Sequence, residues 1–98
     1  MIFLNFLEEY IDYKIAISHV KKMGDGFTII ENICELKGPD YDIDKTLNYL
    51  KQILNCNGSI IKNRDKTKYI QLEGTFKNIL KQFLITTLQV SSGDIVFI

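Results

Sequence analysis

Residues 43–54 read IDKTLNYLKQIL, and the rest of the sequence can be interpreted outward from this stretch. Its apolar residues are separated by four, three and four positions: Ile43, Leu47, Leu50 and Leu54. This spacing places the side chains on one face of an α-helix. Asp40 and Asp42 precede the stretch and offer side-chain oxygens as helix caps. A helix with a single apolar face must pack on a sheet or on another helix, so the flanking sequence should supply one.

Downstream, the segment 55–58 (NCNG) should end this helix, with Asn57 or Gly58 in the left-handed conformation. Two short strands are predicted at 59–63 and 68–73, because both stretches are rich in β-branched or alternating residues. A second helix is predicted to open at Gly74-Thr75, since apolar residues recur at helical spacing after it. These residues are Phe76, Ile79, Leu80, Phe83, Leu84 and Leu88. A turn at 91–93 and a closing strand at 95–98 complete this half.

Upstream, residues 13–20 alternate in polarity and predict a half-buried strand. The segment 23–26 (MGDG) is typical of a hairpin turn, and the β-branched and aromatic stretch 27–33 predicts the returning strand. The predicted order is therefore ββαββαβ. This order favours an α+β fold, a two-layer sandwich in which both helices cover one face of a mixed β-sheet. Leu50 and Phe83 should be buried between the layers.

The length of 98 residues corresponds to one domain with one hydrophobic core. We expect this domain to span residues 13–98 and residues 1–12 to form an N-terminal tail or a short amphipathic helix. No apolar run approaches the roughly 18 residues needed to cross a bilayer. The opening residues lack the basic region and cleavage site of a signal peptide, so we expect a cytoplasmic protein without membrane contact. Cys34 and Cys56 should be free thiols, because no metal-binding or redox spacing surrounds them.

Candidate catalytic groups are few, which argues against an enzyme. His19 is the only histidine and lies within a predicted strand, where a surface role is favoured over that of a catalytic base. Asp42 and Asp44 stand at a helix start, where carboxylates stabilise the N-terminal end of the helix dipole. The segment 24–26 (GDG) lacks the remainder of a phosphate-binding loop. No catalytic residue, metal ligand or cofactor is predicted.

Charge is distributed unevenly along the chain, although the formal net charge is zero. Residues 1–44 hold four lysines and nine acidic residues, whereas residues 45–98 hold eight basic and three acidic residues. Basic groups spaced over a rigid sheet can neutralise successive phosphates of structured RNA. The candidate RNA-binding residues are Lys21, Lys22, Lys45, Lys51, Lys62, Arg64, Lys66, Lys68, Lys77 and Lys81. A solvated lysine-coated surface remains the alternative interpretation.

Several ordered motifs resemble eukaryotic translation initiation factor 1, the SUI-domain family. The family pattern contains D-Y-D, a lysine-rich helix, C-N-G-[ST], I-Q-L-Q-G and a helix with Q-F-L, and this chain has similar motifs in the same order. The matching positions, interpreted mainly as structural, are Tyr41, Asp42, Cys56, Asn57, Gly58, Gln71, Gly74, Gln82 and Phe83. The resemblance covers about residues 13–98 and is strongest from 38 to 84. It implies the two-helix α+β fold that the periodicity also predicts.

The resemblance also implies a non-enzymatic, monomeric factor of protein biosynthesis. Such a factor binds small-subunit rRNA near the P site, supports scanning and start-codon selection, and contacts other initiation factors. In the family, a basic first hairpin loop lies near the decoding region. Here that loop reads KMGDG over 22–26, which keeps Lys21 and Lys22, loses an Arg-Lys pair and gains Asp25. The Arg-Lys of the second helix start becomes Lys77-Asn78, and Val96-Phe97-Ile98 replaces the usual ending. The polar N-terminal tail of the family is replaced by the apolar segment 3–7.

Two functional hypotheses therefore stand at this point. The first is a start-codon-selection factor that binds the small ribosomal subunit. The second is a protein-interaction module with the same fold that has lost rRNA binding, which the neutral net charge and the altered hairpin tip favour. A third class, a small enzyme, has no motif in its support.

Overall fold

Five strands form one mixed sheet in a computed structural model that describes residues 14–98. The strands are β1 (Ile15–Lys22), β2 (Asp25–Glu31), β3 (Gly58–Lys62), β4 (Lys68–Glu73) and β5 (Ile95–Phe97). The helices are α2 (Ile33–Lys37), α3 (Ile43–Leu54) and α4 (Lys77–Thr86), with a 3-10 turn, η1 (Ser92–Asp94), before β5. The interpretation of residues 1–12 as a tail or short helix lies outside the described residues.

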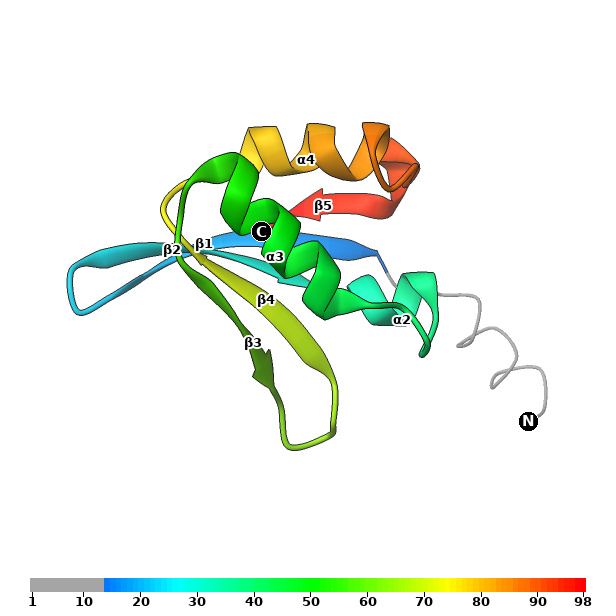
Figure 1. Cartoon of the computed structure of the whole chain (residues 1–98), viewed down its shortest axis with the longest axis horizontal. Coiled ribbons are helices and arrows are strands. Elements are labelled where there is room, and N and C mark those ends of the chain that lie inside the picture. The colour runs from blue at the N-terminus through cyan, green and yellow to red at the C-terminus, as the bar shows by residue number, and fades with distance from the viewer. Residues whose placement is uncertain (1–13) are drawn as a thin grey trace.

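The sheet order is β3-β4-β2-β1-β5. The β1–β2, β2–β4 and β3–β4 pairs are antiparallel, whereas β5 joins β1 in parallel. Helices α3 and α4 cover the same face of this sheet (Figure 1). The predicted α+β two-layer architecture with a mixed sheet is therefore confirmed. Two hairpins, β1–β2 and β3–β4, extend from the body of the molecule in different directions (Figure 1).

The core lies between the sheet and the two long helices. The sheet contributes fully buried residues that include Ile17, Ile30 and Leu72. On the helices, Leu50 is 1% exposed and Phe83 is 8% exposed. The predicted burial of these two side chains is thus confirmed.

A short helix, α2, occupies a position where the sequence predicts the end of a strand. The predicted strand runs to Ile33, but β2 ends at Glu31 and Ile33 begins α2. Asn32 separates the two elements with a left-handed backbone at φ 73°, and its Nδ2 donates a hydrogen bond of 2.9 Å to the carbonyl oxygen of Lys14. Asparagine tolerates this conformation better than β-branched residues do. The strand therefore stops two residues before its predicted end.

The prediction that Asn57 or Gly58 adopts the left-handed conformation after α3 is wrong. Asn55 takes that conformation with φ 49°, whereas neither Asn57 nor Gly58 has a positive φ. Gly58 begins β3 and is required for a different reason. A Cβ atom there would lie 2.7 Å from Leu72 Cδ2, 2.9 Å from the carbonyl oxygen of Gln71 and 3.1 Å from Leu47 Cδ1, so the glycine allows α3 and β4 to approach closely. Crowding, and not backbone conformation, restricts this position.

The starts of the two long helices are capped in different ways. Asp42 Oδ1 accepts a 3.0 Å hydrogen bond from the Lys45 backbone N–H, as predicted for a carboxylate cap. Helix α4 has no side-chain cap of its own at Phe76. Instead the buried Thr28 of β2 donates to the Gly74 carbonyl oxygen at 2.6 Å and accepts from the Phe76 N–H at 3.1 Å. This hydroxyl links the centre of the sheet to the start of α4.

The apolar set predicted for the second helix includes one residue that is not in the core. Ile79 is 52% exposed, whereas its neighbour Leu80 is fully buried. One position along a helix rotates a side chain by about 100°, which carries Ile79 away from the sheet.

Candidate nucleic-acid interface

The β3–β4 tip is a tight turn that closes on itself through short hydrogen bonds. The Asn63 N–H donates to the Thr67 carbonyl oxygen at 2.8 Å, and the Lys66 N–H donates to the Asn63 carbonyl oxygen at 3.1 Å. Asp65 Oδ1 accepts from the Thr67 N–H at 3.1 Å and from the Thr67 hydroxyl at 2.5 Å. These bonds hold the pKa of Asp65 below its usual value, because they stabilise the ionised carboxylate.

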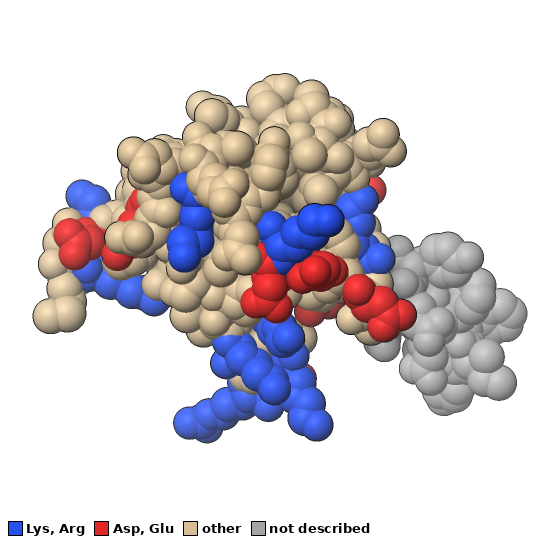
Figure 2. Space-filling model, in the orientation of Figure 1, with Lys and Arg blue, Asp and Glu red and all other residues tan. Residues whose placement is uncertain are grey.

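Four basic side chains surround this turn. Lys62 and Lys68 are cross-strand neighbours at the ends of β3 and β4, while Arg64 and Lys66 lie within the turn. All four are exposed. Figure 2 shows basic side chains gathered at this tip, projecting from the body of the molecule. Among the described residues, none of these cations forms an ion pair, so the tip presents concentrated positive charge to solvent. Together these four residues form the basic tip.

The β1–β2 tip is a two-residue turn of Met23 and Gly24, with φ 53° and 89° respectively. Two positive φ values in succession are typical of the type I′ hairpin turn. The Lys22 Nζ donates a 2.9 Å hydrogen bond to Gln71 Oε1 and lies 5.9 Å from the centre of the Phe27 ring. Asp25 pairs directly opposite Lys22 in the strand register. Lys21 lies opposite Gly26 and presents an unopposed charge at this end.

The other predicted RNA-binding residues lie on the two long helices and do not join the basic tip. Lys45 of α3 is exposed and Lys51 is half-buried. On α4, the Nζ atoms of Lys77 and Lys81 lie 5.4 and 5.5 Å from the centre of the Phe97 ring. Lys77 also donates to the Ile98 carbonyl oxygen at 3.2 Å. The structure therefore gathers four of the ten predicted residues and scatters the others.

Several of the motif residues that the sequence singled out make local packing or hydrogen-bond contacts. The Tyr41 and Thr46 hydroxyls share a 2.5 Å hydrogen bond, and the Asn57 carbonyl oxygen accepts from the Glu73 N–H at 2.9 Å. Gly74 has φ 123°, which favours glycine, and Phe83 stacks on Tyr49 with ring centres 5.6 Å apart. Cys56 is half-buried and Gln82 is exposed.

His19 lies half-buried on β1, where its Nε2 is 3.1 Å from the Thr75 hydroxyl. A Cβ at Gly26 would approach that ring nitrogen to 2.7 Å, so the small residue makes room for the imidazole. No carboxylate orients the ring within the described residues. This environment agrees with a packing role for His19.

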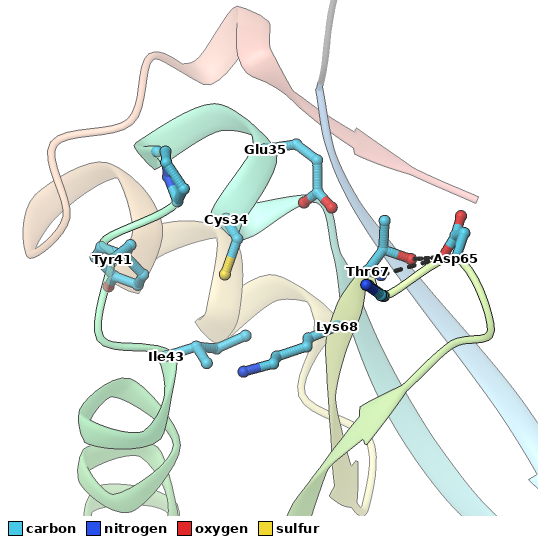
Figure 3. A pocket seen from close by; sticks show the side chains of 10 residues that line it. Cys34, Glu35, Tyr41, Ile43, Asp65, Thr67 and Lys68 are labelled. Carbon is cyan, nitrogen blue, oxygen red and sulfur yellow. Dashed lines mark hydrogen bonds between the residues drawn. The ribbon is translucent and has the colours of Figure 1, made fainter.

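A pocket of about 430 Å³ lies beside the basic tip, between α2 and the β3–β4 turn (Figure 3). Its walls include Cys34 and Glu35 of α2, Tyr41 and Ile43 before and within α3, and Lys66 and Lys68 of the basic tip. Glu35 Oε2 is buried, and no described residue donates a hydrogen bond to it. Burial raises the pKa of the Cys34 thiol, and the Glu35 charge adds to this effect. Sequence inspection missed this pocket, because residues 34–35 and 65–68 become neighbours only in the folded chain.

Residues 14–98 contain neither a membrane-spanning helix nor a group of metal-ligating side chains. No helix there is long and apolar enough to cross a membrane. No three His, Cys, Asp or Glu side chains in that part of the chain gather closely enough to hold a metal ion.

Residues 11–91 match the family model described as translation initiation factor SUI1. A protein translation factor SUI1 homolog of Acanthamoeba polyphaga mimivirus is 41% identical over 70 residues, which is 70% of this chain and 62% of that protein. Saccharomyces cerevisiae eukaryotic translation initiation factor eIF-1 is 32% identical over 56 residues, which is 57% of this chain and 52% of that protein. The chain therefore spans less than two thirds of the length of these relatives.

The fold has a solved counterpart as well. The crystal structure of the C-terminal domain of human eIF2D superposes with a TM-score of 0.74 and 15% sequence identity, covering 85% of this chain and 41% of that one. At this identity the likeness concerns the fold alone. The family is shown by the match over residues 11–91 and by the sequence relatives. This chain therefore belongs to the translation initiation factor SUI1 family.

Proposed function

We propose that this chain is a translation initiation factor that binds small-subunit rRNA and promotes scanning and accurate start-codon selection. The observation that carries the proposal is the basic tip: Lys62, Arg64, Lys66 and Lys68 lie exposed on one projecting turn. Family membership supplies the translational context. This role implies a cytoplasmic location and contacts with other initiation factors.

The geometry of the basic tip suits the RNA backbone better than base edges of a duplex. Two of its cations stand opposite each other at neighbouring strand ends, and strands lie about 4.8 Å apart. Lysine and arginine ends on this hydrogen-bonded turn can neutralise successive phosphates of structured RNA. Binding of this type depends on charge and shape, because phosphates carry no sequence information.

Lys21 and Lys22 remain candidates for a decoding-site contact, as the family resemblance implies. Their arrangement is weaker than that of the basic tip, because Gln71 and Phe27 hold Lys22 against the sheet and Asp25 lies opposite it. We therefore propose that the basic tip supplies the larger share of the RNA contact and that the β1–β2 tip supplies the smaller one.

A second candidate function is a protein-interaction module of the same fold without rRNA binding. Apolar side chains beside α4 favour this alternative: Ile79, Phe97 and Ile98 are 52%, 44% and 73% exposed. Lys77 and Lys81 lie over one of these side chains and are not directed away from the molecule. A protein surface could cover this group.

Co-sedimentation with purified small ribosomal subunits across a salt series separates the two functions. An RNA contact predicts specific binding whose logarithm falls steeply with the logarithm of salt concentration, by somewhat less than one unit for each phosphate contacted. An interaction module predicts no subunit binding without an initiation factor and a capture that is insensitive to salt. Subunit binding that is independent of salt and of the basic tip would overturn the first proposal.

A further inference from the structure

We infer that the pocket beside the basic tip binds one unpaired guanine of an RNA strand, with the Glu35 carboxylate accepting hydrogen bonds from the N1–H and N2–H groups of the base. This inference rests on the proposed function, since the basic tip would hold the phosphates of the same strand. It adds a base-specific contact to what is otherwise recognition of the backbone.

The pocket has the size and wall composition of a small-ligand site. Its volume of about 430 Å³ falls in the range of roughly 300–1,000 Å³ that is usual for such sites. Pro39 and Tyr41 provide apolar and aromatic surface on which a base can lie. Glu35 lines the pocket as well, and Figure 3 shows its carboxylate directed toward the β3–β4 turn. A flat ring with one polar edge fits this combination of surfaces.

The lack of a hydrogen-bond donor at Glu35 indicates that the ligand should offer an edge with N–H groups. Its Oε2 is buried and receives no hydrogen bond from the described residues. A buried acceptor without a donor is destabilising, and a ligand that brings an N–H group removes that penalty. Oε2 is closed to water in this arrangement, so the ligand must displace a neighbouring side chain as it binds. The long, exposed Lys66 and Lys68 side chains are the pocket residues that can move most easily.

Among the four RNA bases, guanine matches a carboxylate best. Its N1–H and N2–H groups are adjacent donors that point in the same direction, so two hydrogen bonds can form with one carboxylate. Adenine and cytosine each place an acceptor next to their single amino donor, and uracil flanks its N3–H with two carbonyl acceptors. These groups form the Watson–Crick edge, on which side chains commonly bind unstacked bases of single-stranded RNA.

The position of the pocket connects the base to the basic tip. Lys66 and Lys68 belong both to the pocket wall and to the basic tip, so a nucleotide bound there would place its phosphate among cations. Asp65 also lines the pocket, but its Oδ1 already accepts two hydrogen bonds from Thr67 within the turn. A base that bonds both oxygens of one carboxylate would therefore compete with Thr67 at Asp65, whereas Glu35 accepts no hydrogen bond from the described residues.

Cys34 provides a reporter inside the pocket, and Cys56 provides a matched reporter outside it. In the full chain carrying Cys56→Ser, the rate of Cys34 alkylation by a maleimide is measured with GMP, AMP, CMP or UMP at equal concentrations. The chain carrying Cys34→Ser reports nonspecific effects through Cys56. We expect GMP to slow Cys34 alkylation with an apparent Kd at least about fivefold lower than that for AMP, the lower end of a two-hydrogen-bond contact. Cys56 alkylation should be unaffected.

Glu35→Gln in the Cys56→Ser chain should remove the preference, because the amide replaces one acceptor with a donor. The preference for GMP over AMP is measured on the chain that keeps Glu35. The test therefore stands even if Glu35→Gln unfolds the protein. Equal protection by all four nucleotides would show that only the phosphate binds, and absence of protection would show that nothing does. Protection by arginine amide as strong as that by GMP would indicate a site for a cationic protein side chain. Each of these three results overturns the inference.

The outcome is independent of the subunit-binding experiment. Salt-dependent subunit binding through the basic tip without GMP protection would remove the guanine site and leave the proposed function intact. GMP protection without subunit binding would remove the proposed function and leave a nucleotide pocket.

Discussion

The two hairpin tips of this molecule use the same kind of residue in different surroundings. At the β1–β2 tip, Lys22 is hydrogen-bonded to Gln71 and faces Asp25 across the strands. At the β3–β4 tip, four basic side chains project into solvent, and the one acidic residue, Asp65, is hydrogen-bonded within the turn. A count of lysines along the sequence does not distinguish these tips. Their capacity to bind a polyanion differs because the contacts around each charge differ.

The turns themselves differ in a related way. Each tip holds a residue with a side chain in the left-handed region: the uncharged Met23, beside Gly24, at the β1–β2 tip with φ 53°, and the basic Lys66 at the β3–β4 tip with φ 72°. A residue with a side chain pays about 1–2 kcal/mol for that conformation, a penalty that glycine avoids. This penalty falls on a charged residue at the β3–β4 tip and on an uncharged one at the β1–β2 tip.

The largest expected effect lies in the core that supports both tips. Leu50→Ala or Phe83→Ala should destabilise the protein by about 2–5 kcal/mol, because each truncation leaves a cavity between α3, α4 and the sheet. Amide hydrogen exchange should then accelerate in both hairpins together. Ile79→Ala on the exposed side of α4 serves as the control and should change stability by less than about 0.5 kcal/mol. Unchanged melting temperatures for both core variants would contradict the two-layer packing.

Gly58→Ala tests the base of the β3–β4 hairpin alone. The added Cβ would meet Leu72 Cδ2 at 2.7 Å and the Gln71 carbonyl oxygen at 2.9 Å, so we expect a loss of about 1–3 kcal/mol in unfolding free energy. Exchange should increase in β3 and β4 more than in β1 and β2. Asn55→Gly is the matched control at the actual left-handed position and should preserve or slightly increase stability. A neutral Gly58→Ala would refute the crowding argument.

These two positions also show what the sequence could and could not predict. The apolar spacing of 43–54 predicted the α3 face correctly, because periodicity depends only on local geometry. The sequence predicts the left-handed residue after α3 at Asn57 or Gly58, because both residue types tolerate a positive φ, but Asn55 adopts that conformation. The close approach of Leu72 that requires Gly58 arises from a strand 14 residues later in the chain.

The same limit applies to the candidate site. The basic residues of the β3–β4 tip were identified from their spacing, since a hairpin brings neighbours in sequence together. Engagement of Lys22 by Gln71, and of Lys77 by the Ile98 carbonyl, depends on contacts across the fold. The pocket that joins Glu35 to Lys68 depends on such contacts too. Long-range juxtaposition was therefore the part of the site that sequence reasoning did not reach.

Charge reversal should separate the tips in function. Arg64→Glu/Lys66→Glu should weaken binding to small ribosomal subunits by about tenfold or more at low salt and reduce the salt slope by between one and two units. Lys21→Glu/Lys22→Glu should also weaken binding, flatten its salt dependence and raise initiation at near-cognate codons, but with a smaller loss of affinity. Co-sedimentation and a start-codon reporter provide the two measurements. A larger loss from the β1–β2 variant would reverse the ranking of the tips.

Gly24→Lys makes the turn of the β1–β2 tip more like that of the basic tip. No atom lies within 4 Å of the position a Cβ would take, so the penalty comes from the backbone at φ 89° and should be about 1 kcal/mol. Chemical denaturation gives the stability, and Gly24→Asn is the control because asparagine accepts this conformation more readily. Subunit binding should rise slightly despite the lower stability. A gain in subunit binding equal to that from a lysine placed on the surface far from either tip would show that the position of the added charge is unimportant.

Asp25→Lys should have the smallest effect on stability and is the finest test of the comparison. Asp25 is an exposed residue at the first position of β2, so its replacement should change the unfolding free energy by less than about 0.5 kcal/mol. The substitution removes the carboxylate opposite Lys22 and adds a cation, which should raise affinity for the small subunit and steepen its salt dependence. The same substitution in the Arg64→Glu/Lys66→Glu background separates two cases. If Asp25→Lys restores subunit binding in that background, the two tips contact RNA independently. If Asp25→Lys raises affinity only when the basic tip is intact, the β1–β2 tip engages RNA only after the basic tip has bound.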